Sequence, residues 1–446
     1  MKRELHYFDV YPKVLPAGEK NTITAKCLDR RFKLPDGKVR VEVIPMTESP
    51  QASEYLGTTR TTLEAEAYSK DGHISISYHF GKEQEYRLKL YLREDEWIML
   101  SVYAVEKDLY ERIPLKGDLH AHTSYSDGWE SPEVIVGYYR KAGFDFMLIS
   151  DHRNYKGSEA AVEFFKGVNI DLNIVKGEEV HAPKNYVHIV NFGGEFSVND
   201  IYAEDEERYY AEVEEIISTF DPSMNFQHED EKFAYASCLW VYERIRKGKG
   251  LAILAHPHWI VDNGHNLRDS MTILQFKQKC FDAFELLGGQ TPAENNMQIA
   301  FYLTACKNGY GDFPVLGSSD AHGTIAERFM TESSFAAKHF DPHGFLEFYS
   351  LVFAKSNDKD EIISSIKDGF CLAIEHYKGG VPRVYGDYRL VSFALFLLRE
   401  YFPLHDEICY EEGRLMLEFA RDNDVKQDLE NKAGRVGNML RKYWGL

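Results

Sequence analysis

Residues 118–128 read DLHAHTSYSDG, and residues 318–322 read SSDAH. These two segments decide the fold prediction, because together they supply six side chains that can bind a metal ion. His120 and His122 are two residues apart, a spacing that places both imidazoles on the same side of an extended strand. The two segments therefore indicate a metal-dependent hydrolase.

Short apolar stretches alternate with helical patterns around and between these segments. Seven stretches are expected to be strands: 113–117, 144–149, 172–180, 186–192, 251–255, 281–287 and 313–316. Such alternation is typical of a parallel barrel or of a doubly wound sheet. We favour the barrel, because active sites of barrel enzymes collect at the carboxyl ends of the strands. Five residues with ligand chemistry are expected at or near those ends: His120, His152, Glu179, His256 and Asp320.

The motifs, taken in order, resemble those of the polymerase and histidinol phosphatase (PHP) superfamily over about residues 113–325. They are DLHAHTSYSDG, SDH at 150–152, GEE at 177–179, His188, AHP at 255–257 and SDAH at 319–322. The resemblance implies a distorted seven-stranded β/α barrel that holds up to three divalent ions. The family pattern has one residue between the glycine and the ligand, so it selects Glu179 rather than Glu178.

The resemblance also implies a division of the ligands among the ions. Carried over by position, the first ion would be bound by His120, His122, Glu179 and Asp320. Glu179 would bridge to a second ion, which His188 and His256 would also bind. The third ion would be held by Asp127, His152 and His322.

The predicted ligand chemistry limits the metal and the substrate. Imidazoles and carboxylates without thiolates suit zinc, iron or manganese, so we expect two or three divalent transition-metal ions. Three carboxylates would supply minus three against plus six from three ions, and the surplus positive charge favours a small anionic substrate. A phosphate ester fits, because adjacent ions can clamp its oxygens while a metal-bound hydroxide attacks.

Two further residues are candidates for binding the substrate. Arg153 follows His152 and could grip a phosphate through its planar guanidinium, although a solvated surface arginine fits the sequence equally well. His258 lies two residues after His256 and is a candidate for protonating the leaving group, with a structural role as the alternative.

Two other functions remain open from the sequence. The same hydroxide could attack a carbonyl, which would make the protein a hydrolase of a carboxylic ester, a carbamate or an amide. The chain could also be a non-catalytic metal-binding module that assembles with a partner.

Composition limits the partners and the compartment. The net charge of −19 argues against nucleic acid as a partner, because that binding relies on basic patches. Six scattered cysteines without a CxxC pair, and the lack of a long apolar run, predict a cytoplasmic protein that does not enter a membrane.

Three domains are expected in the 446 residues. Residues 1–112 carry short strand patterns separated by turn residues, which predicts a small β-sandwich. Residues 113–375 form the PHP-like barrel, and residues 376–446 form a helical C-terminal segment. That segment is expected to pack on the barrel or on a second subunit, which would make the protein a homo-oligomer.

Overall fold

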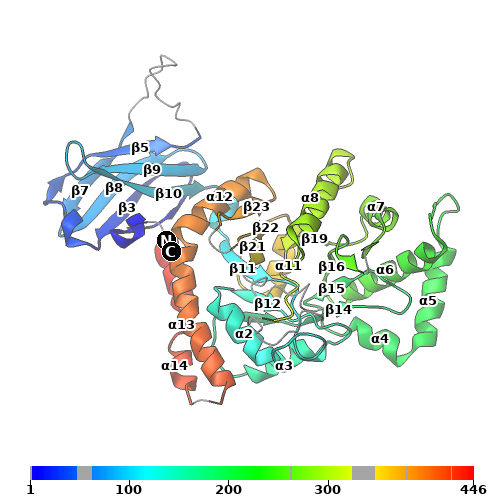
Figure 1. Cartoon of the computed structure of the whole chain (residues 1–446). Helices are drawn as coiled ribbons and strands as arrows, with labels where there is room; N and C mark the ends of the chain where they lie inside the picture. The colour runs from blue at the N-terminus through cyan, green and yellow to red at the C-terminus, as the bar shows by residue number, and fades with distance from the viewer. Residues whose placement is uncertain (1–2, 48–62, 262–263, 324–346, 378–379, 423) are drawn as a thin grey trace. The chain divides into compact units, whose positions relative to one another are not determined.

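The computed structural model describes residues 3–47, 63–261, 264–323, 347–377, 380–422 and 424–446. The chain divides into two compact units (Figure 1). The first unit combines Met1–Ile113 with Tyr388–Ile408 and Gly434–Leu446, and the second combines Pro114–Asp387 with Cys409–Ala433. Parts of the C-terminal segment therefore belong to each unit. Among the described residues, no helix has the length and apolarity needed to cross a membrane.

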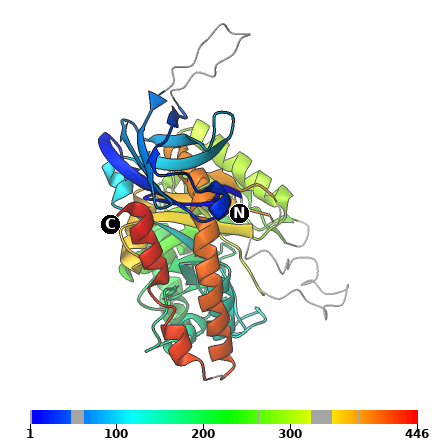
Figure 2. The same cartoon turned by 90° about the vertical axis from the view of Figure 1, so that its left-hand side faces the viewer.

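The first unit contains the predicted β-sandwich, drawn in blue shades in Figures 1 and 2. One sheet has the order β1 (Phe8–Tyr11), β3 (Glu19–Cys27), β8 (His73–Phe80), β7 (Glu66–Lys70) and β4 (Gly37–Lys38). The other has the order β2 (Val14–Pro16), β10 (Trp97–Val105), β9 (Gln84–Tyr91), β5 (Val41–Pro45) and β6 (Leu63–Glu64). Buried and partly exposed residues alternate along β9, which is the period that one buried face of a strand requires. The inner faces of both sheets share one apolar core.

Within the described residues, the first unit contains two short 3-10 turns, η1 (Arg3–His6) and η2 (Arg30–Phe32), and the helices α1 (Lys107–Tyr110), α12 (Tyr388–Glu400) and α15 (Arg435–Trp444). It also includes residues 402–408, which begin α13 (Phe402–Ala420). Tyr103 of β10 packs against Phe393 and Phe396 of α12, with ring centroids 5.0 and 5.4 Å apart. The hydroxyl of Tyr443 in α15 donates a hydrogen bond to Asp9 of β1 over 3.0 Å. Helices from the end of the chain thus complete the unit that begins it.

The second unit contains two larger sheets. The six-stranded sheet has the order β13 (Asn173–Val175), β12 (Phe146–Leu148), β11 (Ile113–Asp118), β21 (Phe348–Ala354), β22 (Cys371–Glu375) and β23 (Arg383–Tyr385). The five-stranded sheet has the order β14 (Gly177–Val180), β15 (Ile189–Phe192), β16 (Leu251–Leu254), β19 (Ala283–Leu287) and β20 (Val315–Gly317). A short hairpin adds β17 (Ile260–Val261) and β18 (Gly264–His265). Most central strands are buried on both faces, which explains their nearly continuous apolar sequences.

Helices surround these sheets in sequence order: α2 (Pro132–Lys141), α3 (Lys156–Phe164), α4 (Val198–Glu204), α5 (Glu206–Ser218), α6 (Glu229–Lys247), α7 (Asp269–Gln278), α8 (Pro292–Lys307), α11 (Lys359–Lys367), α13 (Phe402–Ala420) and α14 (Lys426–Glu430). Buried Arg140 of α2 donates from Nε to Glu412 of α13 over 2.6 Å. A Cβ at Gly413 would lie 2.1 Å from the backbone nitrogen of Lys141, so α2 and α13 can approach this closely only because that position is glycine.

The strands do not form the closed seven-stranded barrel that the sequence predicted. Their ladders make two separate sheets, which meet through two isolated parallel bridges, Ala121–Ala321 and His152–Glu179. The second unit also departs from the predicted barrel in strand direction. β15 runs antiparallel to both β14 and β16, whereas an all-parallel barrel needs a crossover connection at each step. Apolar runs in the sequence mark strands without showing which way they point.

Candidate metal centre

A cluster of histidines and carboxylates gathers around the fully buried side chain of Glu179. Oε1 of this carboxylate lies 2.9 Å from Nδ1 of His188 and 3.5 Å from Nε2 of His256. Oε2 lies 2.7 Å from Nδ1 of His152 and 3.4 Å from Nε2 of His120. Each oxygen of Glu179 therefore faces its own group of imidazole nitrogens, as a carboxylate that bridges two ions must do.

Asp320 defines a second side of the cluster. Its Oδ1 lies 3.0 Å from Nε2 of His122 and 3.3 Å from Nε2 of His120, and its Oδ2 lies 3.8 Å from Nε2 of His256. His120, His122 and Asp320 form a group that could hold one ion, and His120, Glu179 and His256 form another. The two groups share His120.

A third group surrounds the half-exposed carboxylate of Asp127. Its oxygens lie 3.4 Å from Nε2 of His152 and 3.4 Å from Nε2 of His322. His122 faces the same carboxylate through Nδ1 at 3.9 Å. These four residues could also hold one ion. All nine ligand positions predicted from the sequence thus lie in one continuous cluster.

The cluster fits metal ions by its geometry and by its unsatisfied atoms. Several of its buried atoms lack a hydrogen-bond partner: Nε2 of His120, Nδ1 of His122, both oxygens of Glu179 and Nδ1 of His188. Leaving buried polar atoms unpaired is costly, and a bound ion would satisfy them. Ligand atoms at about 2.0–2.1 Å from a tetrahedral ion are about 3.3 Å apart, close to the separations in this cluster.

The direction of β15 explains how His188 reaches the site. His188 immediately precedes β15, whereas Glu179 lies near the end of β14 and His256 follows β16. Because β15 runs antiparallel to both neighbours, its beginning lies at the same edge as their carboxyl ends. The sequence placed His188 in the middle of a strand, but the reversed strand brings it to the ligand edge.

Two aspartates in the metal motifs anchor the loops that carry the ligands. Asp118 accepts hydrogen bonds from the backbone nitrogens of His120 and Ser319, each over 3.1 Å, and so ties the two motifs together. Burial raises the pKa of Asp118 to about 6. Asp151 accepts hydrogen bonds over 2.7 Å from Thr123 and from Ser126, in the loop that leads to Asp127.

The protonation states of the site favour cation binding. Burial by itself would raise the pKa of Glu179, but the surrounding histidines outweigh it and hold that pKa well below its usual range. Burial lowers the pKa of His188 to about 3, which leaves this ring neutral. Burial also acts to lower the pKa of His120, but Asp320, Glu179 and Glu285 raise it well above its ordinary value. An ion would therefore displace a proton from His120.

Glu178 and Glu179 have different roles in the structure. Glu178 points toward the start of α4, where it accepts hydrogen bonds from Ser197 Oγ over 2.8 Å and from Asn199 Nδ2 over 2.7 Å. The backbone nitrogen of Val198 also donates to it over 2.5 Å. A carboxylate at a helix N-terminus is favourable because it pairs with free backbone donors. Glu178 therefore supports α4 and leaves Glu179 to face the histidines.

Two further residues of the cluster, Glu285 and His181, were not predicted from the sequence. Glu285 of β19 is fully buried, and its Oε2 lies 2.9 Å from Nδ1 of His120. A carboxylate in this position orients an imidazole and makes it a better ligand. His181 follows β14, and its Nε2 lies 3.4 Å from Oε2 of Glu179. Signals for both exist in the sequence: a charge inside the apolar run 281–287, and a histidine two residues after the chosen glutamate.

The two predicted substrate-binding residues lie in different surroundings. Arg153 is exposed, and its backbone nitrogen donates to the carbonyl of Glu179 over 3.0 Å. Its backbone has a φ of 53°, a left-handed conformation that is strained for arginine. His258 is buried, and its ring packs against Phe301 and His265 with centroids 5.4 and 5.2 Å apart. These positions leave Arg153 accessible to solvent and His258 surrounded by other rings.

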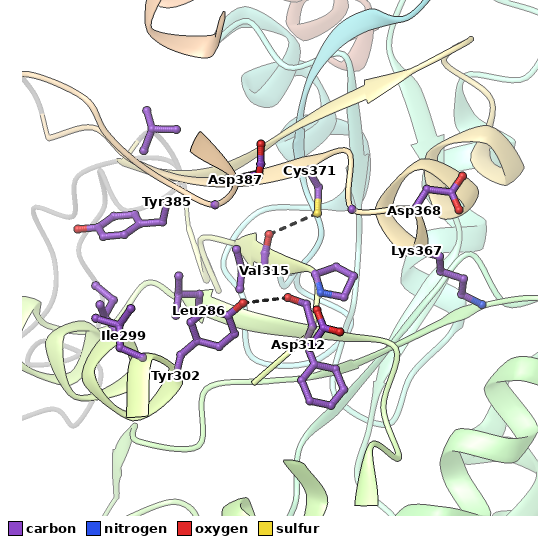
Figure 3. A pocket seen from close by; sticks show the side chains of 16 residues that line it. Leu286, Ile299, Tyr302, Asp312, Val315, Lys367, Asp368, Cys371, Tyr385 and Asp387 are labelled. Atoms are coloured by element: carbon purple, nitrogen blue, oxygen red, sulfur yellow. Dashed lines mark hydrogen bonds between the residues drawn. The ribbon is translucent and has the colours of Figure 1, made fainter. Parts of the chain in front are cut away.

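Figure 3 shows a pocket in the second unit, whose lining includes Leu286, Tyr302 and Cys371. The lining also includes Val315, the first residue of β20, whereas Asp320 follows the last. The pocket has a cavity volume of about 650 Å³, and its lining contains none of the candidate metal ligands. Tyr302 donates to the carbonyl of Phe313 over 3.1 Å, and the Cys371 thiol donates to the carbonyl of Val315 over 3.6 Å. Burial raises the pKa of Cys371 to about 12, so its thiol is not a nucleophile near neutral pH.

Comparisons with known proteins add three solved structures. No protein-family model matches the chain, and no curated protein matches it significantly. A two-domain protein from Bacteroides vulgatus that contains a predicted PHP-like metal-dependent phosphoesterase is 16% identical, with a TM-score of 0.39, over 64% of this chain and 70% of that one. A protein from Bifidobacterium adolescentis, described as a metal-dependent phosphoesterase, is 20% identical, with a TM-score of 0.34, over 48% of this chain and 91% of that one.

The third structure is an amidohydrolase from Chromobacterium violaceum with bound sulfate and no metal. It is 15% identical, with a TM-score of 0.29, over 46% of this chain and 87% of that one. Two of the three proteins are described as metal-dependent phosphoesterases.

Proposed function

We propose that the protein is a metal-dependent phosphoesterase that hydrolyses a small phosphate ester at a site of two or three divalent ions. The observation that carries the proposal is the position of Glu179, whose two oxygens face different groups of imidazole nitrogens within 2.7–3.5 Å. The site lies where the two sheets of the second unit meet through single bridges.

We assign the residues to the ions as the family resemblance implies. One ion is assigned to His120, His122, Glu179 and Asp320. A second is assigned to Glu179, His188 and His256, and a third to Asp127, His152 and His322. Ligands of this chemistry suit zinc, iron or manganese. When bound, such ions supply Lewis acidity and a hydroxide nucleophile near neutral pH.

The chain's own residues favour an anionic substrate. Asp127, Glu179, Asp320 and the neighbouring Glu285 carry four negative charges, fewer than the six positive charges of three divalent ions. Arg153 is exposed beside His152, where its guanidinium can hold a phosphate oxygen. The net charge of −19 speaks against a nucleic acid as the substrate. A small phosphorylated molecule is therefore the substrate class that fits this site.

The experiment compares two chromogenic substrates on protein reconstituted with zinc, manganese or iron. We expect hydrolysis of p-nitrophenyl phosphate that chelators abolish and that metal restores, with little hydrolysis of p-nitrophenyl acetate. The variant His120→Ala should lose this activity, and His73→Ala, which changes an exposed histidine of β8 in the first unit, should retain it. Metal-dependent hydrolysis of the acetate alone would replace the proposal with a hydrolase of carbonyl substrates.

A further inference from the structure

His181 lies beside the predicted ligands at the end of β14. It is two residues after Glu179, and alternate residues of a strand point to the same side. Its side chain is 16% exposed, and its ring lies 4.6 Å from that of His152 and 4.0 Å from that of His188 between centroids. The strand therefore directs His181 into the cluster that surrounds Glu179.

Three ligand atoms form a closed triangle at this point. Nε2 of His181 lies 3.4 Å from Oε2 of Glu179 and 3.0 Å from Nδ1 of His152, and the last two atoms lie 2.7 Å apart. These residues form a group that could hold one ion. The rings of His152 and His181 share a hydrogen bond between Nδ1 and Nε2. Oε2 of Glu179 has no hydrogen-bond partner, so the triangle leaves this oxygen available to an ion that the two imidazoles could also bind.

The chain holds His181 in place from both sides of its peptide unit. Its backbone nitrogen donates to Oδ1 of Asn199 over 3.2 Å, and its carbonyl accepts from the hydroxyl of Tyr202 over 2.9 Å. Asn199 is itself fixed, because its Nδ2 donates to Glu178 over 2.7 Å. The start of α4 thus positions His181, and preorganisation of this kind is typical of a ligand.

His152 alone cannot serve both groups that it touches. Its Nε2 faces Asp127 at 3.4 Å, and its Nδ1 faces Glu179 at 2.7 Å. A neutral imidazole has one nitrogen that can bind an ion, while the other carries a proton. If His152 binds the ion at Asp127 through Nε2, its Nδ1 cannot also bind an ion at Oε2 of Glu179, and His181 is the imidazole of this triangle that remains able to do so.

We propose that His181 is a tenth metal ligand, which binds through Nε2 to an ion carried by Glu179. This inference rests on the proposed function, because it assumes that the cluster binds divalent ions. It extends the ligand set by a residue that neither the motif pattern nor the family resemblance assigns.

The test compares His181→Ala and His181→Gln with wild-type protein and with the control His73→Ala. Zinc content is measured by elemental analysis, and zinc affinity by chelator competition. Cobalt(II) is bound in a parallel experiment, where the intensity of its visible absorption reports the number of ligands. Glutamine keeps the size and the hydrogen-bonding capacity of histidine but is a poor ligand for these ions. Thermal unfolding in the presence of chelator checks that each variant folds.

We expect both His181 variants to bind one ion at least about tenfold more weakly than wild type, since even residues that only orient a ligand have effects of this size. The cobalt spectrum should change with them, and His73→Ala should match wild type. Restoration of affinity by glutamine would show that His181 is a hydrogen-bond partner and would overturn the inference. Unchanged metal binding in both variants would also overturn it, and the proposed function would stand. A wild-type protein that takes up no ion would refute both.

Discussion

Glu285 is expected to strengthen metal binding without touching the ion. Its carboxylate and the ring of His120 are both fully buried, and Oε2 lies 2.9 Å from Nδ1 of His120. The hydrogen bond directs the other ring nitrogen, Nε2, toward Glu179 and Asp320 at 3.4 and 3.3 Å. Replacing Glu285 by leucine removes the acceptor and the negative charge while leaving every predicted ligand in place.

The magnitude follows from this contact. Loss of such an outer partner costs about 10- to 100-fold in metal affinity, which corresponds to about 1.4–2.7 kcal/mol. A hydrogen bond to a charged group contributes about 1.5–3 kcal/mol, in agreement with that range. Glu285→Gln keeps an acceptor oxygen and loses only the charge, so its effect should be smaller than that of leucine.

The assay is competition between the protein and a chromophoric chelator for zinc, with circular dichroism of the metal-free proteins as the folding control. Leucine should weaken the tightest measurable site, and glutamine should fall between leucine and wild type. A folded Glu285→Leu protein with wild-type zinc affinity would show that His120 does not depend on Glu285, and would refute the reasoning.

Three other predictions follow from the same contacts. Glu179→Gln should remove two ions at once, because each oxygen of Glu179 faces a different group of imidazoles. The control Glu178→Gln should retain both ions, since Glu178 contacts the start of α4 instead. Elemental analysis that finds only one ion lost from Glu179→Gln would show that another residue is the bridge. Arg153→Ala should raise KM for a phosphorylated substrate by about tenfold and leave the metal content unchanged. Tenfold corresponds to the lower end of the free energy that a hydrogen bond to a charged group contributes, which suits an exposed side chain. An unchanged KM would show that Arg153 does not bind the substrate. Burial lowers the pKa of His258 from its ordinary 6.5 to about 4, so the unfolded chain takes up the proton first and stability is lost as the pH falls from 6.5 toward 4. Between pH 7 and pH 5 wild type should lose about 2 kcal/mol more of its free energy of unfolding than His258→Leu, as measured by urea denaturation; equal losses would contradict the burial of this ring.

Local patterns in the sequence predicted much of the fold. Strand-type composition between turn residues predicts strands at 21–27, 39–44, 73–78, 86–91 and 97–105, and the structure has β3, β5, β8, β9 and β10 there to within a few residues. Ser131 is a capping residue and Pro132 suits the first helical position, so the pair predicts the helix start that α2 has. Strand direction was not readable, because an apolar run such as 186–192 is the same in either direction, so the reversal of β15 was not predicted. Local patterns also do not show that the two sheets meet only through single bridges.

The candidate site was partly readable for a related reason. Motifs such as DLHAH contain their candidate ligands within one short segment, and the structure brings all nine predicted positions together. Glu285 was missed because its role depends on a contact with His120, 165 residues away in the chain. His181 could have been noticed, since the spacing rule applied to His120 and His122 also applies to Glu179 and His181.

The central claim is that this cluster binds several divalent ions. Elemental analysis of the purified chain, after chelation and reconstitution with zinc, manganese or iron, tests it most directly. Two or three ions per chain are expected, with at least two of them lost in Glu179→Gln. One ion or none in the reconstituted wild-type protein would contradict the account.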